Sequence, residues 1–113
     1  MRTINRAVLV VRPREPFIRW AASLDANAPE HATDLQSSVS VYLVPEDPDG
    51  EFETPRLAEY FAEIFERELE AWWTDPDQWP RRRDFATFQE WFEVIGDSLV
   101  TDLGVGPVEV EEL

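Results

Sequence analysis

The chain contains no cysteine, so it has neither disulfides nor thiolates that could bind a metal ion or attack a substrate. Its only histidine, His31, stands in a polar stretch with no cysteine or second histidine to complete a metal site. The apolar run at 7–11 is too short for a signal-peptide core or a membrane span. We therefore expect a cytoplasmic protein with no cofactor, no metal ion and no membrane partner.

Signatures of catalysis are also missing. The sequence has no nucleophile elbow, no Ser–His pairing pattern and no glycine-rich phosphate loop. The acidic stretch at 46–51, "EDPDGE", resembles half of a calcium loop but lacks its twelve-residue spacing and its terminal glutamate. "DPDG" is instead typical of a type I turn. The sequence therefore leans away from an enzyme.

Lysine is absent as well, and all ten basic residues are arginines, against 24 acidic residues and a net charge of −14. Residues 1–20 hold five arginines and one glutamate, whereas residues 21–80 hold two arginines and fifteen acidic residues. Such a negative surface repels nucleic acids and anionic membranes and favours a basic protein as partner. It also suits a DNA mimic, an acidic inhibitor that occupies a DNA-binding protein.

The length of 113 residues fits one compact domain spanning 1–113. Apolar periodicity and turn residues predict a strand at 4–12, a helix beginning at Pro16, a strand at 38–44, helices at 54–73 and 84–95, and a strand at 98–103. The first strand is apolar at consecutive positions, so we expect it to be central and covered on both faces. The fold class is then α+β: a three- or four-stranded sheet in β-α-β-α-α-β order, packed by two or three helices. Residues 104–113 form a weak edge strand or a frayed tail.

The predicted helix at 54–73 has two faces, because successive residues turn by about 100°. The apolar face packs on the sheet together with that of the helix at 84–95. The residues expected to be buried are Phe61, Trp72, Phe88, Trp91 and Phe92. The opposite face is charged and holds Arg56, Glu59, Glu63, Glu66, Arg67 and Glu70.

Glu68 breaks this pattern, because it projects among the apolar residues. A buried carboxylate is costly unless it is paired. We therefore expect a structural ion pair between Glu68 and one residue of the arginine run, which is Arg81, Arg82 or Arg83. The alternative is a poised acid or base, because perturbed carboxylates cluster at active sites.

The stretch "AWWTDPDQWPRRRDF" at 71–85 joins the two helices and is open to two interpretations. In the first, the tryptophans fill a helix–helix corner and the arginines neutralise the glutamates at the end of the preceding helix. In the second, the corner is an exposed anchor for a protein partner, together with the acidic helix face. The candidate partner-binding residues are Trp73, Trp79, Glu59, Glu63, Glu66 and Glu70.

Three arginines surround the start of the first helix and are candidates for binding phosphate or carboxylate: Arg12, Arg14 and Arg19. A small enzyme or anion-binding protein that uses them with Glu68 is therefore an alternative to a non-enzymatic interaction or regulatory module. A homo-oligomer joined through the tryptophan corner or an open sheet edge is a third possibility.

Four segments carry a resemblance to a known group of proteins: "RPREPF", "VYLVPE", "WWTDPDQWP" and "FQEWFEV". With them the chain resembles small acidic bacterial proteins of unassigned function. The resemblance covers most of the chain and implies one compact bacterial domain. It implies no activity and no site.

Overall fold

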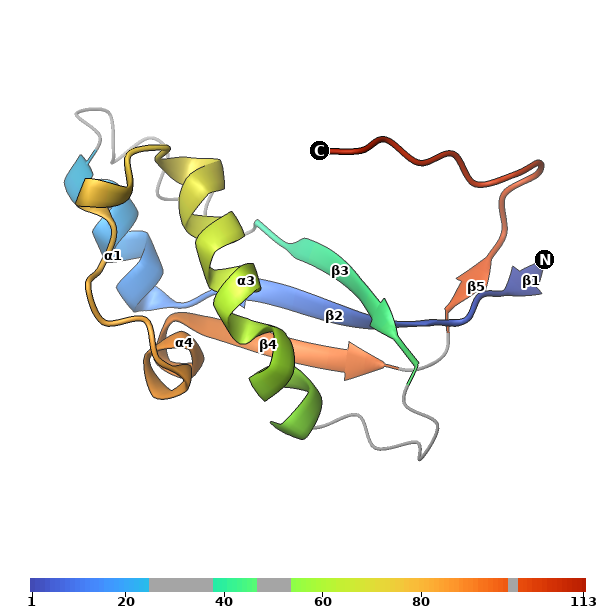
Figure 1. Ribbon diagram of the computed structural model, residues 1–113, viewed down its shortest axis with the longest axis horizontal. Coiled ribbons are helices and arrows are strands. Elements are labelled where there is room, and N and C mark those ends of the chain that lie inside the picture. Colours follow the sequence, from blue (N-terminus) through green and yellow to red (C-terminus); the bar gives the residue numbers. More distant parts are fainter. Residues whose placement is uncertain (25–37, 47–53, 98–99) are drawn as a thin grey trace.

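The computed structural model describes residues 1–24, 38–46, 54–97 and 100–113. His31 and most of the acidic stretch at 46–51 lie outside these residues. The described chain forms a three-stranded antiparallel sheet, a two-stranded sheet and three α-helices (Figure 1). The protein therefore has the α+β fold that the sequence predicts.

The central sheet has the strand order β3-β2-β4, with both neighbours antiparallel to β2. Its strands are β2 (Arg6–Pro13), β3 (Ser40–Pro45) and β4 (Phe92–Asp97). Its helices are α1 (Glu15–Leu24), α3 (Thr54–Trp72) and α4 (Phe85–Trp91). Along the chain these six elements follow the predicted β-α-β-α-α-β order.

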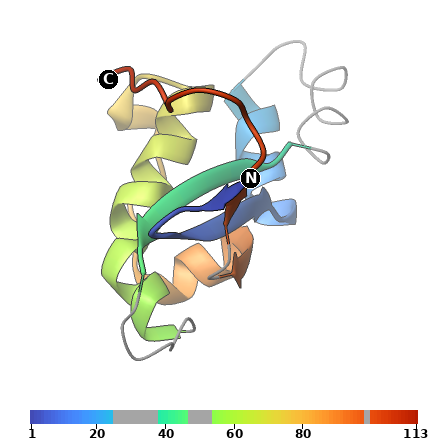
Figure 2. The same ribbon diagram turned by 90° about the vertical axis from the view of Figure 1, so that its right-hand side faces the viewer.

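The core lies on one face of this sheet. Helix α3 crosses that face, and α1 and α4 pack at the end where β2 leaves the sheet and β4 enters it (Figures 1 and 2). The buried side chains include Ala7, Leu9 and Val11 of the sheet and Ile64, Phe65, Leu69 and Phe88 of the helices. Of the residues predicted to be buried, Phe88 and Phe92 are buried, whereas Phe61, Trp72 and Trp91 are partly buried at the core's margin.

Strand β2 is central, as predicted, but only one of its faces is covered by the helices. Burial alternates along the strand, so that Ala7, Leu9 and Val11 are buried while Val8 and Val10 remain partly exposed. An antiparallel sheet has this alternation when helices pack on one side only. The expectation of cover on both faces was wrong, because the apolar run does not record which face the helices occupy.

The helix predicted at 84–95 ends earlier, at Trp91, and the chain continues directly into β4. Phe92 therefore reaches the core from a strand, and Ile95 lies exposed on the sheet's other face. The apolar residues here fit a helical spacing and a strand alternation equally well. Pairing with β2 over six residues decides in favour of the strand. Among the described residues of the strand predicted at 98–103, Thr101–Asp102 form strand β5.

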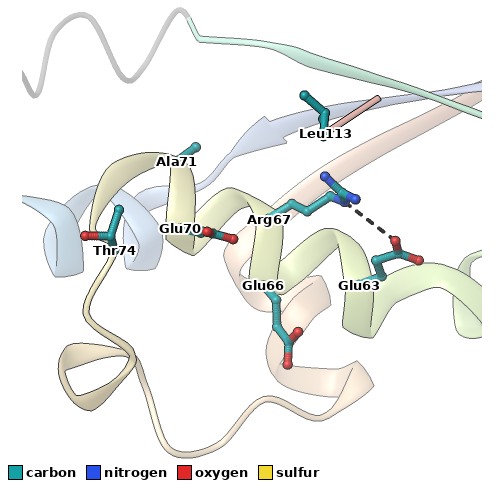
Figure 3. Close-up of a pocket in the computed structure, with 7 residues that line it drawn as sticks. All are labelled: Glu63, Glu66, Arg67, Glu70, Ala71, Thr74 and Leu113. Atoms are coloured by element: carbon teal, nitrogen blue, oxygen red, sulfur yellow. Dashed lines mark ion pairs between the residues drawn. The ribbon is translucent and has the colours of Figure 1, made fainter. Parts of the chain in front are cut away.

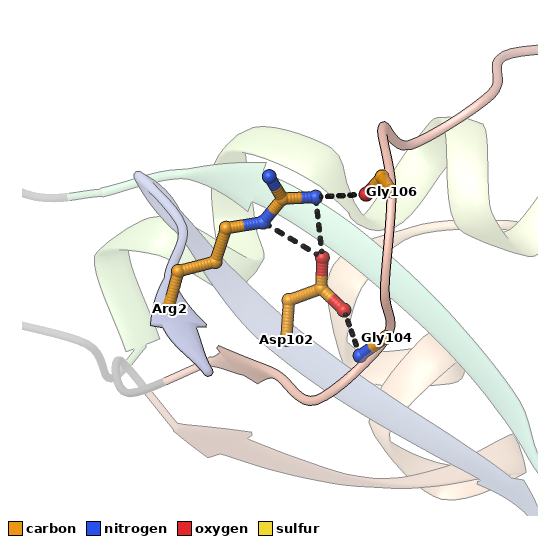
Figure 4. A network of polar contacts seen from close by, with 4 residues as sticks. All are labelled: Arg2, Asp102, Gly104 and Gly106. Atoms are coloured by element: carbon orange, nitrogen blue, oxygen red, sulfur yellow. Dashed lines mark hydrogen bonds and ion pairs between the residues drawn. The ribbon is translucent and has the colours of Figure 1, made fainter.

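Strand β5 pairs with β1 (Arg2–Thr3) in a small sheet that fixes the start of the C-terminal segment. Arg2 donates hydrogen bonds to the carboxylate of Asp102 at 3.0–3.1 Å and to the carbonyl of Gly106 at 2.7 Å (Figure 4). The same carboxylate accepts the amide of Gly104 at 2.8 Å, and these contacts hold its pKa below the usual range. Beyond this anchor, residues 107–113 have no regular structure and are exposed.

None of the described helices is long and apolar enough to cross a lipid bilayer.

Candidate functional site

The tryptophan corner is held together by hydrogen bonds from indole nitrogens to backbone carbonyls. Trp79 Nε1 donates to the carbonyl of Trp73 at 2.7 Å, and Trp72 Nε1 donates to that of Ala21 at 3.2 Å. Trp20 Nε1 donates to the carbonyl of Gln78 at 2.9 Å. Because buried indoles need such partners, these contacts tie α1 to the end of α3 and support the structural interpretation of the corner. Trp73 and Trp79 are both partly buried within it.

The arginine run takes part in local contacts instead of neutralising the end of α3. Arg82 pairs with Asp84 at 2.8 Å, and Arg83 donates to the carbonyl of Pro80 at 2.7 Å while its guanidinium lies 5.8 Å from the Trp79 ring centroid. No ion pair joins Arg81, Arg82 or Arg83 to Glu66, Glu68 or Glu70 in the part of the chain that the structure describes. The predicted neutralisation was wrong, because Arg82 and Arg83 instead contact residues of their own segment, Asp84 and Pro80.

Glu68 lies on the side of α3 that faces the sheet, where it is partly buried. Its Oε1 accepts a hydrogen bond of 2.8 Å from the hydroxyl of Tyr42 on β3. The expected ion pair with the arginine run is therefore replaced by a neutral donor from the sheet. Burial, and then the Glu68 carboxylate, raise the pKa of Tyr42 above its usual range, because both penalise the phenolate.

This contact predicts a loss of stability at alkaline pH. Folded Tyr42 keeps its proton above about pH 10, where the unfolded chain loses it, so the free energy of unfolding should fall as the pH rises further. The chain has no lysine and no cysteine, so neither side chain adds to the change in this range. Urea unfolding between about pH 8 and pH 11 should show the fall.

Substitution should separate the contribution of Tyr42 from that of the other tyrosine. Tyr42→Phe should make the free energy of unfolding less dependent on pH above about pH 10. Tyr60→Phe should keep the part of this pH dependence that Tyr42 causes. An unchanged alkaline slope in Tyr42→Phe would contradict the assignment.

The charged, exposed face of α3 forms the wall of a hollow of about 690 Å³. Its lining residues are Glu63, Glu66, Arg67, Glu70, Ala71, Thr74 and Leu113 (Figure 3). Arg67 and Glu63 extend toward one another at 3.6 Å, a surface pair in which both side chains are about half exposed or more. Such a pair stabilises the fold by roughly 0–1 kcal/mol. Three carboxylates and one guanidinium therefore give this hollow a negative charge.

A second hollow, of about 250 Å³, lies between α3 and β3 and shares Glu63 and Arg67 with the first. Its other lining residues are Tyr42, Leu43, Val44, Tyr60 and Ile64. Beside it, β3 is hydrogen-bonded on one side only, to β2, within the described sheet. The two hollows and this strand edge together form a surface that we call the β3–α3 groove, with an apolar pocket and an acidic wall.

The structure brings together part of the predicted partner surface. Glu63, Glu66 and Glu70 line the groove, and Glu59 is exposed one turn earlier on α3. The groove residues that the sequence analysis missed are Tyr42, Tyr60 and Ile64. Their signal was present in the strand alternation at 38–44 and in the apolar arc of the long helix, but nothing local indicated that these two elements pack side by side.

The three candidate anion-binding arginines do not converge with Glu68. Arg12 points to the face of the sheet away from the helices, as the alternation along β2 requires. Arg19 pairs with Glu15 at 3.8 Å on the exposed side of α1, whereas Arg14 immediately precedes this helix. Among the described residues, no group of three His, Cys, Asp or Glu side chains is arranged to hold a metal ion. The described structure therefore does not bring Arg12, Arg14 and Arg19 together with Glu68 in one site.

No protein-family model, curated protein or solved structure matches the chain. The resemblance to small acidic bacterial proteins therefore remains an expectation, and a function has to be inferred from the surface itself.

Proposed function

We propose that the protein is a non-enzymatic, cytoplasmic interaction module that binds an extended, basic segment of a partner protein in the β3–α3 groove. The observation that carries the proposal is the continuity of the groove. The apolar pocket beside the edge of β3 and the acidic wall of α3 share two lining residues, Glu63 and Arg67.

The edge of β3 accounts for the extended form of the partner. A strand that is paired on one side only presents backbone N–H and C=O groups to which a peptide can add as a further strand. Side chains of such a peptide alternate in direction, so one apolar residue can enter the pocket between Tyr42, Tyr60 and Ile64. The peptide residues on either side of this apolar residue then lie near the rim of the pocket.

The charge of the wall accounts for the basic character of the partner. Glu63, Glu66 and Glu70 outnumber Arg67 there, and Glu66 and Glu70 have no ion-pair partner in the described chain. Leu113 at the end of the exposed tail borders the hollow (Figure 3), and the two residues before it in the chain are the exposed glutamates Glu111 and Glu112. A DNA-binding protein is one partner with this chemistry. The tryptophan corner is left out of the surface, because the indole nitrogens of Trp72 and Trp79 donate to backbone carbonyls of the protein itself.

The test is an NMR titration with a synthetic peptide of alternating valine and arginine, and with a valine–glutamate peptide as the matched control. The basic peptide should shift the amide signals of β3 and of α3 around residues 60–67, and the acidic peptide should not. Methylation of alternate peptide nitrogens should abolish binding, because it removes the strand pairing that the proposal requires.

Protein variants test the acidic wall. Glu66→Gln and Glu70→Gln should each weaken binding of the basic peptide by about two- to fivefold, as loss of an exposed charge pair does. Glu90→Gln, which removes an exposed carboxylate on α4, should leave the affinity unchanged. Equal weakening by all three variants would mean that only the net charge attracts the peptide, and the groove would be discarded as the site.

A further inference from the structure

Residues 107–113, which we call the tail, have the sequence of a β-strand but no strand partner among the described residues. Valine and glutamate alternate at 108–111, a pattern typical of a strand with one apolar and one charged side. The valines are exposed, by 66% at Val108 and 78% at Val110. The tail is therefore an unpaired segment that is suited to pair with a strand.

The start of the tail is fixed to the rest of the fold. Arg2 donates to the carbonyl of Gly106 at 2.7 Å and to the carboxylate of Asp102 at 3.0 Å, and this carboxylate accepts the amide of Gly104 at 2.8 Å (Figure 4). Gly106 has a φ of 94°, in the left-handed region that glycine adopts without strain. These contacts set the direction in which the tail leaves the small sheet.

That direction carries the tail along the β3 side of the central sheet. In Figures 1 and 2 the tail lies on the side of β3 away from β2, and in Figure 1 it runs opposite to the arrow of β3, toward α3. Leu113 lines the hollow together with Arg67 (Figure 3). When extended, residues 107–112 span about 20 Å, the length of the six-residue strand β3. The tail thus has the position, direction and length of an antiparallel strand beside the β3–α3 groove.

Charge explains why the tail stands away from the groove in the free protein. The tail carries three exposed glutamates, Glu109, Glu111 and Glu112, and the wall of the hollow carries three more. Like charges repel, so direct packing of the tail on the wall is disfavoured. A basic peptide strand between them reverses this balance, because its side chains attract the carboxylates on both sides.

We propose that the tail is a strap that closes over the basic segment bound in the β3–α3 groove, so that the segment becomes the middle strand between β3 and the tail. This inference rests on the proposed function, because it requires a peptide strand beside β3. A peptide added to β3 still has one free edge, and that edge can pair with the tail. Tethering through Gly106 raises the effective concentration of the tail there. Opposite charges across the new strand pair add to its stability.

NMR titration with the valine–arginine peptide tests the closure. The amide signals of residues 107–112 should shift with the same saturation curve as those of β3, and their hydrogen exchange should slow by about tenfold or more. Two methylated peptides separate the two pairings. Methylation of the alternate nitrogens that face β3 should abolish binding, whereas methylation of the other alternate nitrogens should weaken it about threefold and leave the tail signals unshifted. A peptide that shifts β3 but not the tail overturns the strap alone, and a peptide that does not bind overturns the proposed function as well.

Release of the anchor tests the tether. Arg2→Gln removes the contacts to Gly106 and Asp102 and should weaken binding of the basic peptide about threefold or more. Arg6→Gln is the matched control, because Arg6 is also exposed and its guanidinium donates to the carbonyl of its neighbour Asn5. Both variants make the protein more negative by one charge, so attraction by net charge alone predicts equal or tighter binding in each.

The strap predicts weaker binding in Arg2→Gln only. Unshifted amide signals of β2 and β3 in the free Arg2→Gln variant should show that the central sheet is intact. An affinity in Arg2→Gln equal to that of the parent overturns the strap. Tighter binding in Arg2→Gln than in Arg6→Gln also overturns it, because the tail would then compete with the peptide for the groove.

Discussion

Replacing Phe88 by alanine should lower the free energy of unfolding by about 3–5 kcal/mol, because a large ring is lost from a site that collapses poorly. Phe88 has no exposed surface and sits where α4 meets both α3 and β4. Its ring centroid lies 5.7 Å from that of Phe65, 5.2 Å from that of Phe92 and 6.0 Å from that of Phe61. Truncation removes contacts with all three rings at once.

Urea unfolding of the parent and of Phe88→Ala measures this effect. Gln89→Ala is the control, because Gln89 is the exposed neighbour on the same helix and alanine suits a helix well. It should change stability by about 0.5 kcal/mol or less. A loss below about 1 kcal/mol in Phe88→Ala would mean that the inner face of α4 has been assigned incorrectly.

The second large effect is expected at Leu9, in the centre of the sheet. Leu9 is 2% exposed and belongs to the core that α3 covers, whereas Leu43 on the neighbouring strand is 54% exposed on the face of the sheet turned away from the helices. Leu9→Ala should cost about 2–5 kcal/mol, and the identical substitution at Leu43 should cost about 1 kcal/mol or less. The contrast isolates burial, because residue type and sheet are the same.

The measurement is again urea unfolding. Similar losses in Leu9→Ala and Leu43→Ala would show that both faces of the sheet are covered in the folded protein. That result would revive the expectation drawn from the apolar run at 7–11, and would contradict the one-sided architecture.

Local patterns in the sequence were enough to predict several elements. The start of α4 is one case: Asp84 was expected to cap a helix, and its carboxylate accepts the Thr87 amide at 2.8 Å and the Thr87 hydroxyl at 2.6 Å. These two bonds and the one from Arg82 hold the pKa of Asp84 below its usual range. The long helix was likewise predicted within one residue of its observed end at Trp72. Caps and helical faces depend on residues a few positions apart, so the sequence carries them directly.

Other features were decided by contacts between distant segments. Residues 92–97 fit a helix or a strand by their own spacing, and pairing with β2 chose the strand. Glu68 was recognised as an unusual carboxylate, but its partner came from Tyr42, 26 residues away on β3. The acidic face of α3 could be predicted from helical spacing, whereas the pocket beside it depended on where β3 packs.

The sequence by itself thus determined the fold class, the order of the main elements and the sites where helices begin, because each depends on local spacing and capping. The tertiary structure decided which face of the sheet remains uncovered by helices, where α4 ends and β4 begins, and which group donates a hydrogen bond to Glu68. Those outcomes depend on the free energy of packing segments that are remote in the chain, and no local pattern records which of several equally apolar faces is buried.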